Sequence, residues 1–249
     1  MRERPYVDRV LDAYREQVLR WNRQINLVSR QAPADRLERL ILQSRNTWKL
    51  LTEAEAIDFS PRTRLWYFDL GSGAGLPGFI WHLEAVSAGI AVRTRLVEPR
   101  EKRAWFLNRL NSLDGVEPLE VLEDRWENAA GDHPSVDDPS GVQDLTDPTQ
   151  ALISLKALHL TDTTVLGGLV PFLSRGPGAS RDLRILITRF YPPGQVWNED
   201  LALDLEIPPS GEARAFPGWE FQGTGGGVLL AKSPRGASLV FSRYIARSS

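Results

Sequence analysis

Apolar residues recur every three or four positions through the first part of the chain, with charged residues between them. This spacing places the apolar residues on one face of a helix that ends near residue 25. The face comprises Val7, Val10, Leu11, Tyr14, Val18, Trp21 and Ile25. A second helix is predicted from about Asp35 to Leu51. We therefore expect an N-terminal helical extension over residues 1–63.

From residue 64 onward, short apolar runs alternate with helical patterns. The runs predicted as strands are Arg64 to Leu70, Ile90 to Glu98, Leu119 to Leu122, Ala151 to Leu155 and Leu183 to Thr188. Helices are predicted after the first, second and fourth of these runs. Near the end, Val228 to Ala231 and Ser238 to Tyr244 are typical of an antiparallel pair. This order predicts an α/β fold with a mostly parallel sheet and helices on both faces.

Residues 64–249 are expected to form one compact domain. Its segment 131–149 is polar and rich in proline and aspartate, which indicates a flexible acidic surface loop.

The amino-acid composition excludes several classes of protein and of functional site. With 42% hydrophobic residues, the chain can bury a substantial core, and the absence of cysteine excludes disulfides and thiolate chemistry. The three histidines lie far apart in sequence, so no metal site is expected. The N-terminus is charged and no apolar stretch is long enough to cross a bilayer, so we expect a cytoplasmic protein without a membrane partner. The formal net charge of −2 argues against nonspecific coating of nucleic acid.

The segment D-L-G-S-G-A-G-L-P-G, residues 69–78, follows the first predicted strand directly. Glycine tolerates positive φ and has no Cβ, so a ligand can approach the backbone closely at such a turn. Open α/β sheets bind their ligands at this carboxyl edge of the strands. A tight turn without a ligand is the alternative.

Two classes of cofactor compete for this turn. The stretch from Gly73 to Gly78 matches G-x-G-x-x-G, the dinucleotide fingerprint. Asp69 and the glycines after it also match the acidic-x-G-x-G-x-G pattern of adenosylmethionine-binding enzymes. A carboxylate there can meet the amino group of a methionine moiety, or order a water to it, but gains nothing beside a pyrophosphate. Pro77 also lacks the N–H that a dinucleotide turn would donate. The methyl donor is therefore favoured over nicotinamide.

Glu98 ends the second predicted strand and is expected beside the glycine turn. A carboxylate in that place can accept hydrogen bonds from both ribose hydroxyls, a geometry shared by nicotinamide and methyl-donor sites. Glu98 thus supports a cofactor that contains adenosine, and it is consistent with both a nicotinamide dinucleotide and adenosylmethionine. A solvated acid at a strand end is the alternative.

Four segments together resemble the bacterial small-subunit ribosomal RNA guanine-N7 methyltransferases, also called the glucose-inhibited division protein B family. They are W-N-R-Q-I-N-L-V (21–28), the glycine segment (69–78), L-V-E-P-R-E-K-R-A-W-F-L (96–107) and D-R-W-E-N (124–128). The resemblance implies a Rossmann-like class I methyltransferase fold with S-adenosyl-L-methionine as cofactor. It also implies a guanine of 16S ribosomal RNA as substrate, as RNA or within the small ribosomal subunit. We expect a monomer.

The resemblance places the methionine at the glycine turn, the ribose at Glu98 and the adenine along residues 125–127. The expected cofactor-binding residues are Asp69, Gly71, Ser72, Gly73, Gly75, Glu98, Trp126 and Glu127.

Guanine N7 is already a lone-pair nucleophile, so methyl transfer to it needs alignment and no general base. Basic side chains are expected to hold the phosphates of the RNA. We assign Lys156 and Arg125 to the catalytic group, and Arg23, Lys102 and Arg189 to substrate binding. Lys156 is favoured because it follows a predicted strand end directly.

The chain departs from the family pattern on the expected substrate side. Leu40 and Gln43 stand where the family has histidine and aspartate, Lys156 where arginine is usual, and Arg189 within a usual lysine-glycine pair. These departures motivate one alternative, a methyltransferase acting on a small molecule or protein. Two further alternatives are a nicotinamide dehydrogenase and a catalytically silent adenosylmethionine-binding interaction protein.

Overall fold

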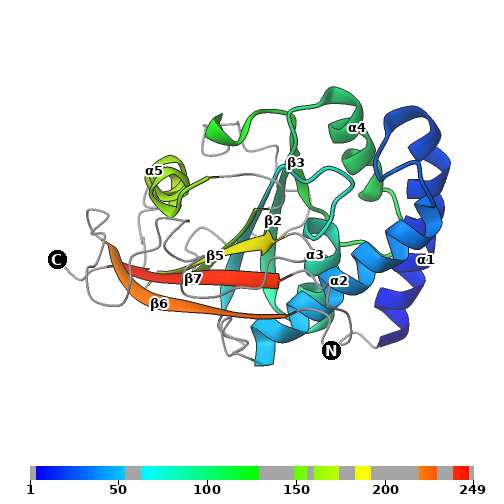
Figure 1. The fold of residues 1–249 in the computed structure, drawn as a ribbon. Helices are drawn as coiled ribbons and strands as arrows, with labels where there is room; N and C mark the ends of the chain where they lie inside the picture. The colour runs from blue at the N-terminus through cyan, green and yellow to red at the C-terminus, as the bar shows by residue number, and fades with distance from the viewer. Residues whose placement is uncertain are drawn as a thin grey trace.

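A seven-stranded sheet forms the centre of the fold (Figure 1) in a computed structural model that describes residues 4–53, 63–128, 149–155, 160–173, 183–191, 219–228 and 238–246. The strands are β1 Arg64–Leu70, β2 Ala91–Val97, β3 Glu120–Leu122, β4 Gln150–Leu155, β5 Arg184–Tyr191, β6 Trp219–Val228 and β7 Ser238–Ala246. Their order across the sheet is β3-β2-β1-β4-β5-β7-β6. Strands β1 to β5 are parallel, and β7 runs antiparallel to its neighbours β5 and β6. The predicted α/β fold with a mostly parallel sheet is confirmed.

Helices cover both faces of this sheet. They are α1 Arg4–Ile25, α2 Pro33–Glu53, α3 Gly78–Ser87, α4 Glu101–Leu110 and α5 Asp162–Leu173, with a short 3₁₀ turn at Trp126–Asn128. Buried side chains of α1 to α4 share one apolar cluster, whereas those of α5 pack in a second cluster on the other face. Figure 1 shows α5 standing apart from the other four helices.

Strand β1 shows why both faces are covered. Leu65 and Tyr67 pack in a cluster with side chains of α2 and α3. Trp66, Phe68 and Leu70 pack instead in the cluster of α5. Successive side chains of a strand point to opposite faces, so a strand buried on both faces is apolar throughout. Strand β1 lies between β2 and β4, where the strand order reverses, and open α/β sheets bind their ligands at the carboxyl ends of the strands at such a point.

The predicted helices and the first five strands agree with the structure to within a few residues. The prediction for one late strand misplaced its start. The antiparallel pair exists, but its first member, β6 Trp219–Val228, begins nine residues before the predicted run of Val228 to Ala231, of which residues 229–231 lie outside the described residues. The sequence G-T-G-G-G lies inside β6 and gives no pattern typical of a strand, because glycine is depleted in strands. Most of the predicted acidic loop, residues 131–148, lies outside the described residues.

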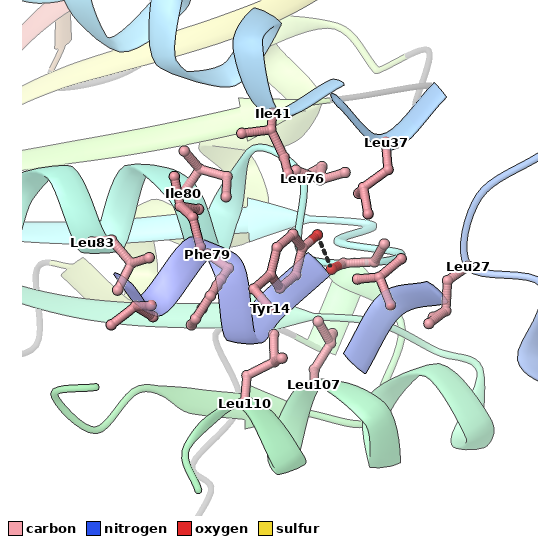
Figure 2. Close-up of a cluster of buried hydrophobic side chains, with 14 of the residues drawn as sticks. Tyr14, Leu27, Leu37, Ile41, Leu76, Phe79, Ile80, Leu83, Leu107 and Leu110 are labelled. Atoms are coloured by element: carbon pink, nitrogen blue, oxygen red, sulfur yellow. Dashed lines mark hydrogen bonds between the residues drawn. The ribbon is translucent and has the colours of Figure 1, made fainter. Parts of the chain in front are cut away.

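Helix α1 packs directly over the loop that follows β1. The Tyr14 hydroxyl donates a 2.9 Å hydrogen bond to the carbonyl oxygen of Ala74, and its ring lies 5.2 Å from that of Phe79. Figure 2 shows this hydrogen bond among apolar side chains from α2, α3 and α4. Burial, with a smaller effect from the charge of Asp69, raises the pKa of Tyr14, so the phenol stays neutral and donates. The N-terminal helix therefore fixes one side of the loop.

His82 is a buried structural histidine on α3. Its Nδ1 lies 2.9 Å from the Thr94 hydroxyl and its Nε2 lies 2.9 Å from the carbonyl oxygen of Glu117. A carbonyl only accepts, so Nε2 donates and Nδ1 accepts from the threonine. Burial lowers the pKa of His82 to about 4. The ring thus joins α3 to β2 and to the loop before β3 as a neutral side chain.

Of the helices that the structure describes, none combines the length and the apolar character that a bilayer crossing requires.

Acid should destabilise the fold through His82. Its folded pKa is depressed from 6.5 to about 4, so the unfolded chain takes up a proton that the folded chain refuses as the pH falls through this window. The free energy of unfolding should therefore fall by an amount on the order of 3 kcal/mol between pH 6.5 and about pH 4. Urea unfolding of the wild type and of His82→Gln checks this. Equal pH slopes in the two proteins across the window would contradict it.

Tyr14→Phe should lower the free energy of unfolding by about 1–3 kcal/mol, because it leaves the buried Ala74 carbonyl without its donor while the ring packing is kept. Denaturant melting measures the loss. Tyr14→Leu is the comparison, because it removes the ring contact as well and should cost more. An unchanged midpoint for Tyr14→Phe would show that the hydrogen bond does not hold the loop.

Candidate functional site

The glycine turn lies at the carboxyl end of β1. Gly71, Gly73 and Gly75 have φ of 76°, 59° and 88°, which is the left-handed region that other residues rarely adopt. Gly75 has a second constraint, because a Cβ there would lie 3.1 Å from the Cβ of Phe79 and 3.3 Å from a methyl group of Leu107. The glycines predicted for close backbone approach are therefore required by the conformation, and Gly75 also lets α3 and α4 pack.

Backbone hydrogen bonds tie the turn to the end of β2. The N–H groups of Gly71 and Ser72 both donate to the Val97 carbonyl, at 2.8 and 3.1 Å. The Ser72 hydroxyl donates to the carbonyl of Asp69 at 2.8 Å, and the Gly75 N–H donates to the carbonyl of Ser72 at 2.8 Å. Ser72 therefore stabilises the turn through hydrogen bonds within it, and its predicted contact with the cofactor stays a prediction.

Asp69 lies beneath the turn and is 1% exposed. Its Oδ2 accepts a 3.2 Å hydrogen bond from the N–H of Gly78, the first residue of α3. Its Oδ1 accepts a hydrogen bond from the hydroxyl of Ser154 on β4. Any side chain at Gly78 would overlap the Asp69 carboxylate. The carboxylate therefore contacts protein on both oxygens, and its contact with a methionine amino group stays a prediction.

This arrangement disfavours a dinucleotide at the turn. A pyrophosphate binds to free N–H groups at the start of a helix. Here the Gly78 N–H is bonded to a carboxylate, the Phe79 N–H donates to the Gly75 carbonyl at 2.8 Å, and Pro77 has no N–H. A buried carboxylate beneath the turn also repels a phosphate, so the site suits a cofactor that carries positive charge.

Glu98 lies beside the turn, as the parallel arrangement predicts. Its Oε2 accepts a 2.9 Å hydrogen bond from the Gly73 N–H, and its Oε1 accepts a 3.0 Å hydrogen bond from the Arg100 N–H. A carboxylate has about four lone-pair sites, so these two donors leave accepting capacity on both oxygens. The role of Glu98 in holding a ribose stays a prediction, and its geometry beside the turn agrees with that role.

The face of the turn at Gly73 is open. Among described atoms, a Cβ built on Gly73 would meet only the carbonyl oxygen of Gly71, 4.0 Å away. A ligand can therefore lie against this backbone, with the Glu98 carboxylate next to it. An uncharged surface of backbone, open at one glycine and flanked by a carboxylate, fits the amino-acid and sugar portions of adenosylmethionine.

Residues 125–127 follow β3 at the same edge of the sheet. Arg125 and Glu127 are exposed, and their charged groups lie 3.9 Å apart. Trp126 is half-buried and packs against α5, where a Cβ at Gly168 would lie 3.1 Å from its ring. Helix α5 therefore holds one side of the Trp126 indole in place. Stacking of Trp126 on an adenine stays a prediction.

Arg189 sits at the carboxyl end of β5 and is 7% exposed. Its guanidinium pairs with Asp162, the first residue of α5, and donates a 2.9 Å hydrogen bond to the Leu160 carbonyl. These contacts fasten the start of α5 to the sheet, so the structure gives Arg189 a structural role that the sequence did not indicate. Lys156 lies outside the described residues.

Arg23 and Lys102 lie on two helices, α1 and α4, that pack in one apolar cluster. Both are exposed, Arg23 in the last turn of α1 and Lys102 in the first turn of α4. Arg103 joins these two helix ends, because its Nη2 donates a 3.0 Å hydrogen bond to the Asn26 carbonyl. Of the two predicted substrate-binding residues, Lys102 thus lies on the helix that begins just after Glu98 and Arg23 lies on the helix that Arg103 bonds to it.

Sequence reasoning missed three residues that shape the site. Tyr14 matched an apolar helical stripe and was expected only in the core, and nothing local to it indicates a contact with Ala74, 60 residues away. Ser154 lies in a buried strand, where a polar residue is the one signal of a partner. Gly78 was noted only as part of a motif.

The described residues contain no group of three or more histidine, aspartate or glutamate side chains arranged to hold a metal ion.

Comparison with known proteins identifies relatives. The family model described as "GidB: rRNA small subunit methyltransferase G" matches residues 8–138, more than half of the chain. A ribosomal RNA small subunit methyltransferase G from Nitratidesulfovibrio vulgaris is 31% identical over 164 residues, which cover 66% of this chain and 68% of that protein. One of the same name from Ruegeria pomeroyi is 29% identical over 191 residues, covering 77% of this chain and 75% of that protein.

The crystal structure of an rRNA methylase from Streptococcus thermophilus aligns with a TM-score of 0.44 and 16% identity, over 77% of this chain and 94% of that chain. The family match runs from residue 8, within α1, to beyond β3, and it includes the glycine turn, Glu98 and residues 125–127. By this match and by its relatives, the chain belongs to the rRNA small subunit methyltransferase G family.

Proposed function

We propose that this protein transfers the methyl group of S-adenosyl-L-methionine to N7 of a guanine in 16S ribosomal RNA. Membership of the family makes the chain an adenosylmethionine-dependent methyltransferase. The observation that carries the proposal is the open glycine turn, with one carboxylate beneath it and another beside it. The matching segments and the names of the relatives support small-subunit ribosomal RNA as the substrate.

Adenosylmethionine, when bound, supplies an electrophilic methyl group on a positively charged sulfonium. Gly71 and Gly73 would support its methionine portion, because the backbone at Gly73 is open on one face. Glu98 would accept hydrogen bonds from the ribose hydroxyls, and Trp126 with Glu127 would border the adenine. Two carboxylates near the turn favour a cationic ligand. The same charges oppose the pyrophosphate of the nicotinamide alternative.

Catalysis in this proposal comes from alignment. The N7 lone pair attacks without prior loss of a proton, so no side chain has to act as a base. Holding the two reactants at attack distance can lower the barrier by roughly 7–11 kcal/mol. The rigid turn contributes here, because its N–H groups and carbonyls are bonded to β2 and α1.

Basic side chains would hold the RNA phosphates. Arg23 and Lys102 are exposed on the neighbouring helices α1 and α4, and Arg125 is exposed after β3. Lys156 keeps its proposed place near the reacting base. Arg189 would act indirectly by holding α5, because its guanidinium is engaged with Asp162. The proposal places the protein in the cytoplasm, with 16S RNA or the small subunit as its partner, acting as a monomer.

Within this proposal, residues 1–63 form a helical extension that covers the glycine turn, and residues 64–249 form the methyltransferase domain. The contact of Tyr14 with Ala74 supports the covering role.

A methyltransferase acting on another substrate is the second candidate. The burial of Arg189 favours it, because one cation expected for RNA is turned inward. Leu40 favours it too, because this residue packs on the apolar cluster of the helices where the family has a histidine. Small-subunit labelling, described below, separates the two candidates.

Gly73→Ala should weaken adenosylmethionine binding by about tenfold or more, because the new methyl group fills the open face of the turn. Gly89→Ala is the matched control. Gly89 also has a positive φ, at 77°, and no described atom lies within 4 Å of its Cβ position, but it follows α3 at the other edge of the sheet. Both variants should lose about 1–2 kcal/mol of stability from backbone strain. Isothermal titration measures affinity, and an equal loss of affinity in both variants would contradict the placement of the site.

Purified protein given methyl-labelled adenosylmethionine and small ribosomal subunits from a strain that lacks this enzyme should label the 16S RNA at guanine N7. Nuclease digestion and mass spectrometry of the RNA would locate the methyl group. Label on protein alone, or on no macromolecule despite measured cofactor binding, would contradict RNA as the substrate.

A further inference from the structure

Helix α4 presents an exposed tryptophan on its outer side. Trp105 is 42% exposed, and among the large hydrophobic residues that the structure describes only Leu42 is more exposed. The other residues on this side of α4, Lys102, Asn108 and Arg109, are polar. An exposed indole keeps apolar surface in contact with water, which is unfavourable unless a partner covers it.

The ring of Trp105 is held in a fixed orientation. It packs edge-to-face against Trp21 of α1, with ring centroids 4.7 Å apart and planes at 77°. The Arg109 guanidinium lies 5.2 Å from the Trp105 ring and 5.5 Å from the Trp21 ring. Trp21 is fixed in turn by a 3.2 Å hydrogen bond from its Nε1 to Gln17. A rigid aromatic surface binds a planar partner at low entropic cost.

The two segments that carry the rings are strongly positive, although the whole chain has a net charge of −2. Residues 20–23 and 100–109 contain seven ionisable side chains, of which only Glu101 is acidic. The cations are Arg20, Arg23, Arg100, Lys102, Arg103 and Arg109. None of them has an ion pair with a described carboxylate, whereas Arg15, Arg45 and Arg95 all do. Unbalanced cations on an otherwise acidic protein indicate an anionic partner.

This surface continues from the cofactor site. Helix α4 begins at Glu101, three residues after Glu98, and Arg103 bonds it to the end of α1. From Glu101 to Arg109 the helix extends about 12 Å along its axis. Figure 1 shows α1 and α4 side by side, and their side chains share one apolar cluster. A strand whose target base lies at the turn could therefore pass along α4.

We infer that the Trp21–Trp105 patch (Arg20, Trp21, Arg23, Lys102, Trp105 and Arg109) binds single-stranded RNA next to the target nucleotide, with a base stacked on Trp105 and phosphates against the arginines. Bases stack on exposed aromatic rings whatever their sequence, and arginine and lysine neutralise the backbone. An acidic polypeptide would use the cations but would leave the flat indole face without a partner. The inference rests on the proposed RNA substrate and adds where the flanking strand lies.

The test uses the full chain and a short fluorescein-labelled oligouridylate, followed by fluorescence anisotropy at several salt concentrations. Trp105→Leu should weaken binding roughly tenfold, because an aliphatic side chain of similar polarity offers no stacking surface. Arg109→Gln should reduce the slope of log affinity against log salt by about 0.7. Lys49→Gln, which removes an exposed cation of α2 paired with Glu53, is the matched control and should change neither quantity.

Three results would overturn the inference: no binding of the oligonucleotide by the wild type, wild-type affinity and salt slope in the patch variants, or equal competition by polyglutamate of the same charge. If Trp105→Leu did not fold, judged by circular dichroism, the slope of Arg109→Gln decides. The outcome is separable from the proposed function. If Trp105→Leu labels small subunits normally, the inference about the patch is contradicted and the proposed substrate is not. If the oligonucleotide binds through the patch but no subunit is labelled, the proposed substrate is contradicted and the RNA-binding patch is not.

Discussion

The hydrogen bond from the Gly78 N–H to the buried Asp69 carboxylate is the contact on which the site depends. It closes the N-terminus of α3, and the second carboxylate oxygen reaches across to Ser154 on β4. A buried carboxylate is costly unless hydrogen bonds compensate for lost water, so these donors are needed for the fold itself. The negative charge also adds to the effect of burial in raising the pKa of Tyr14 and Tyr67, so both phenols stay neutral. Tyr14 donates to the Ala74 carbonyl, and the Tyr67 hydroxyl is hydrogen-bonded to Ser154.

The same contact determines which ligand the turn can take. A helix N-terminus with free N–H groups attracts phosphate, and here that attraction is cancelled from within the protein. What remains is an open stretch of backbone at Gly73 beside a second carboxylate, Glu98. Such a site favours a cation with a sugar attached. The fold, the charge and the family membership of the chain therefore agree on adenosylmethionine, although each is an independent property.

The elements and the cofactor turn could be predicted from sequence because their signals are local. A short apolar run such as R-L-W-Y-F-D-L predicts a strand buried on both faces, and the three glycines after it predict a turn with positive φ, because glycine adopts that conformation without steric cost. Strand β6 could not be predicted, because its glycines carry no strand signal and its pairing with β7 is a tertiary contact. Arg189 was predicted to bind substrate, and its ion pair with Asp162, 27 residues earlier, could not be predicted from the sequence. Charge partners distant in sequence leave no local pattern.

A crystal structure of the protein with S-adenosylhomocysteine tests the central claim most directly. The account predicts the amino-acid portion of the ligand over Gly71 and Gly73, the ribose hydroxyls within hydrogen-bonding distance of Glu98, and the Asp69 bond to Gly78 unchanged. Ligand bound elsewhere, or a turn in which Asp69 has released Gly78 to free the helix N-terminus, would contradict it.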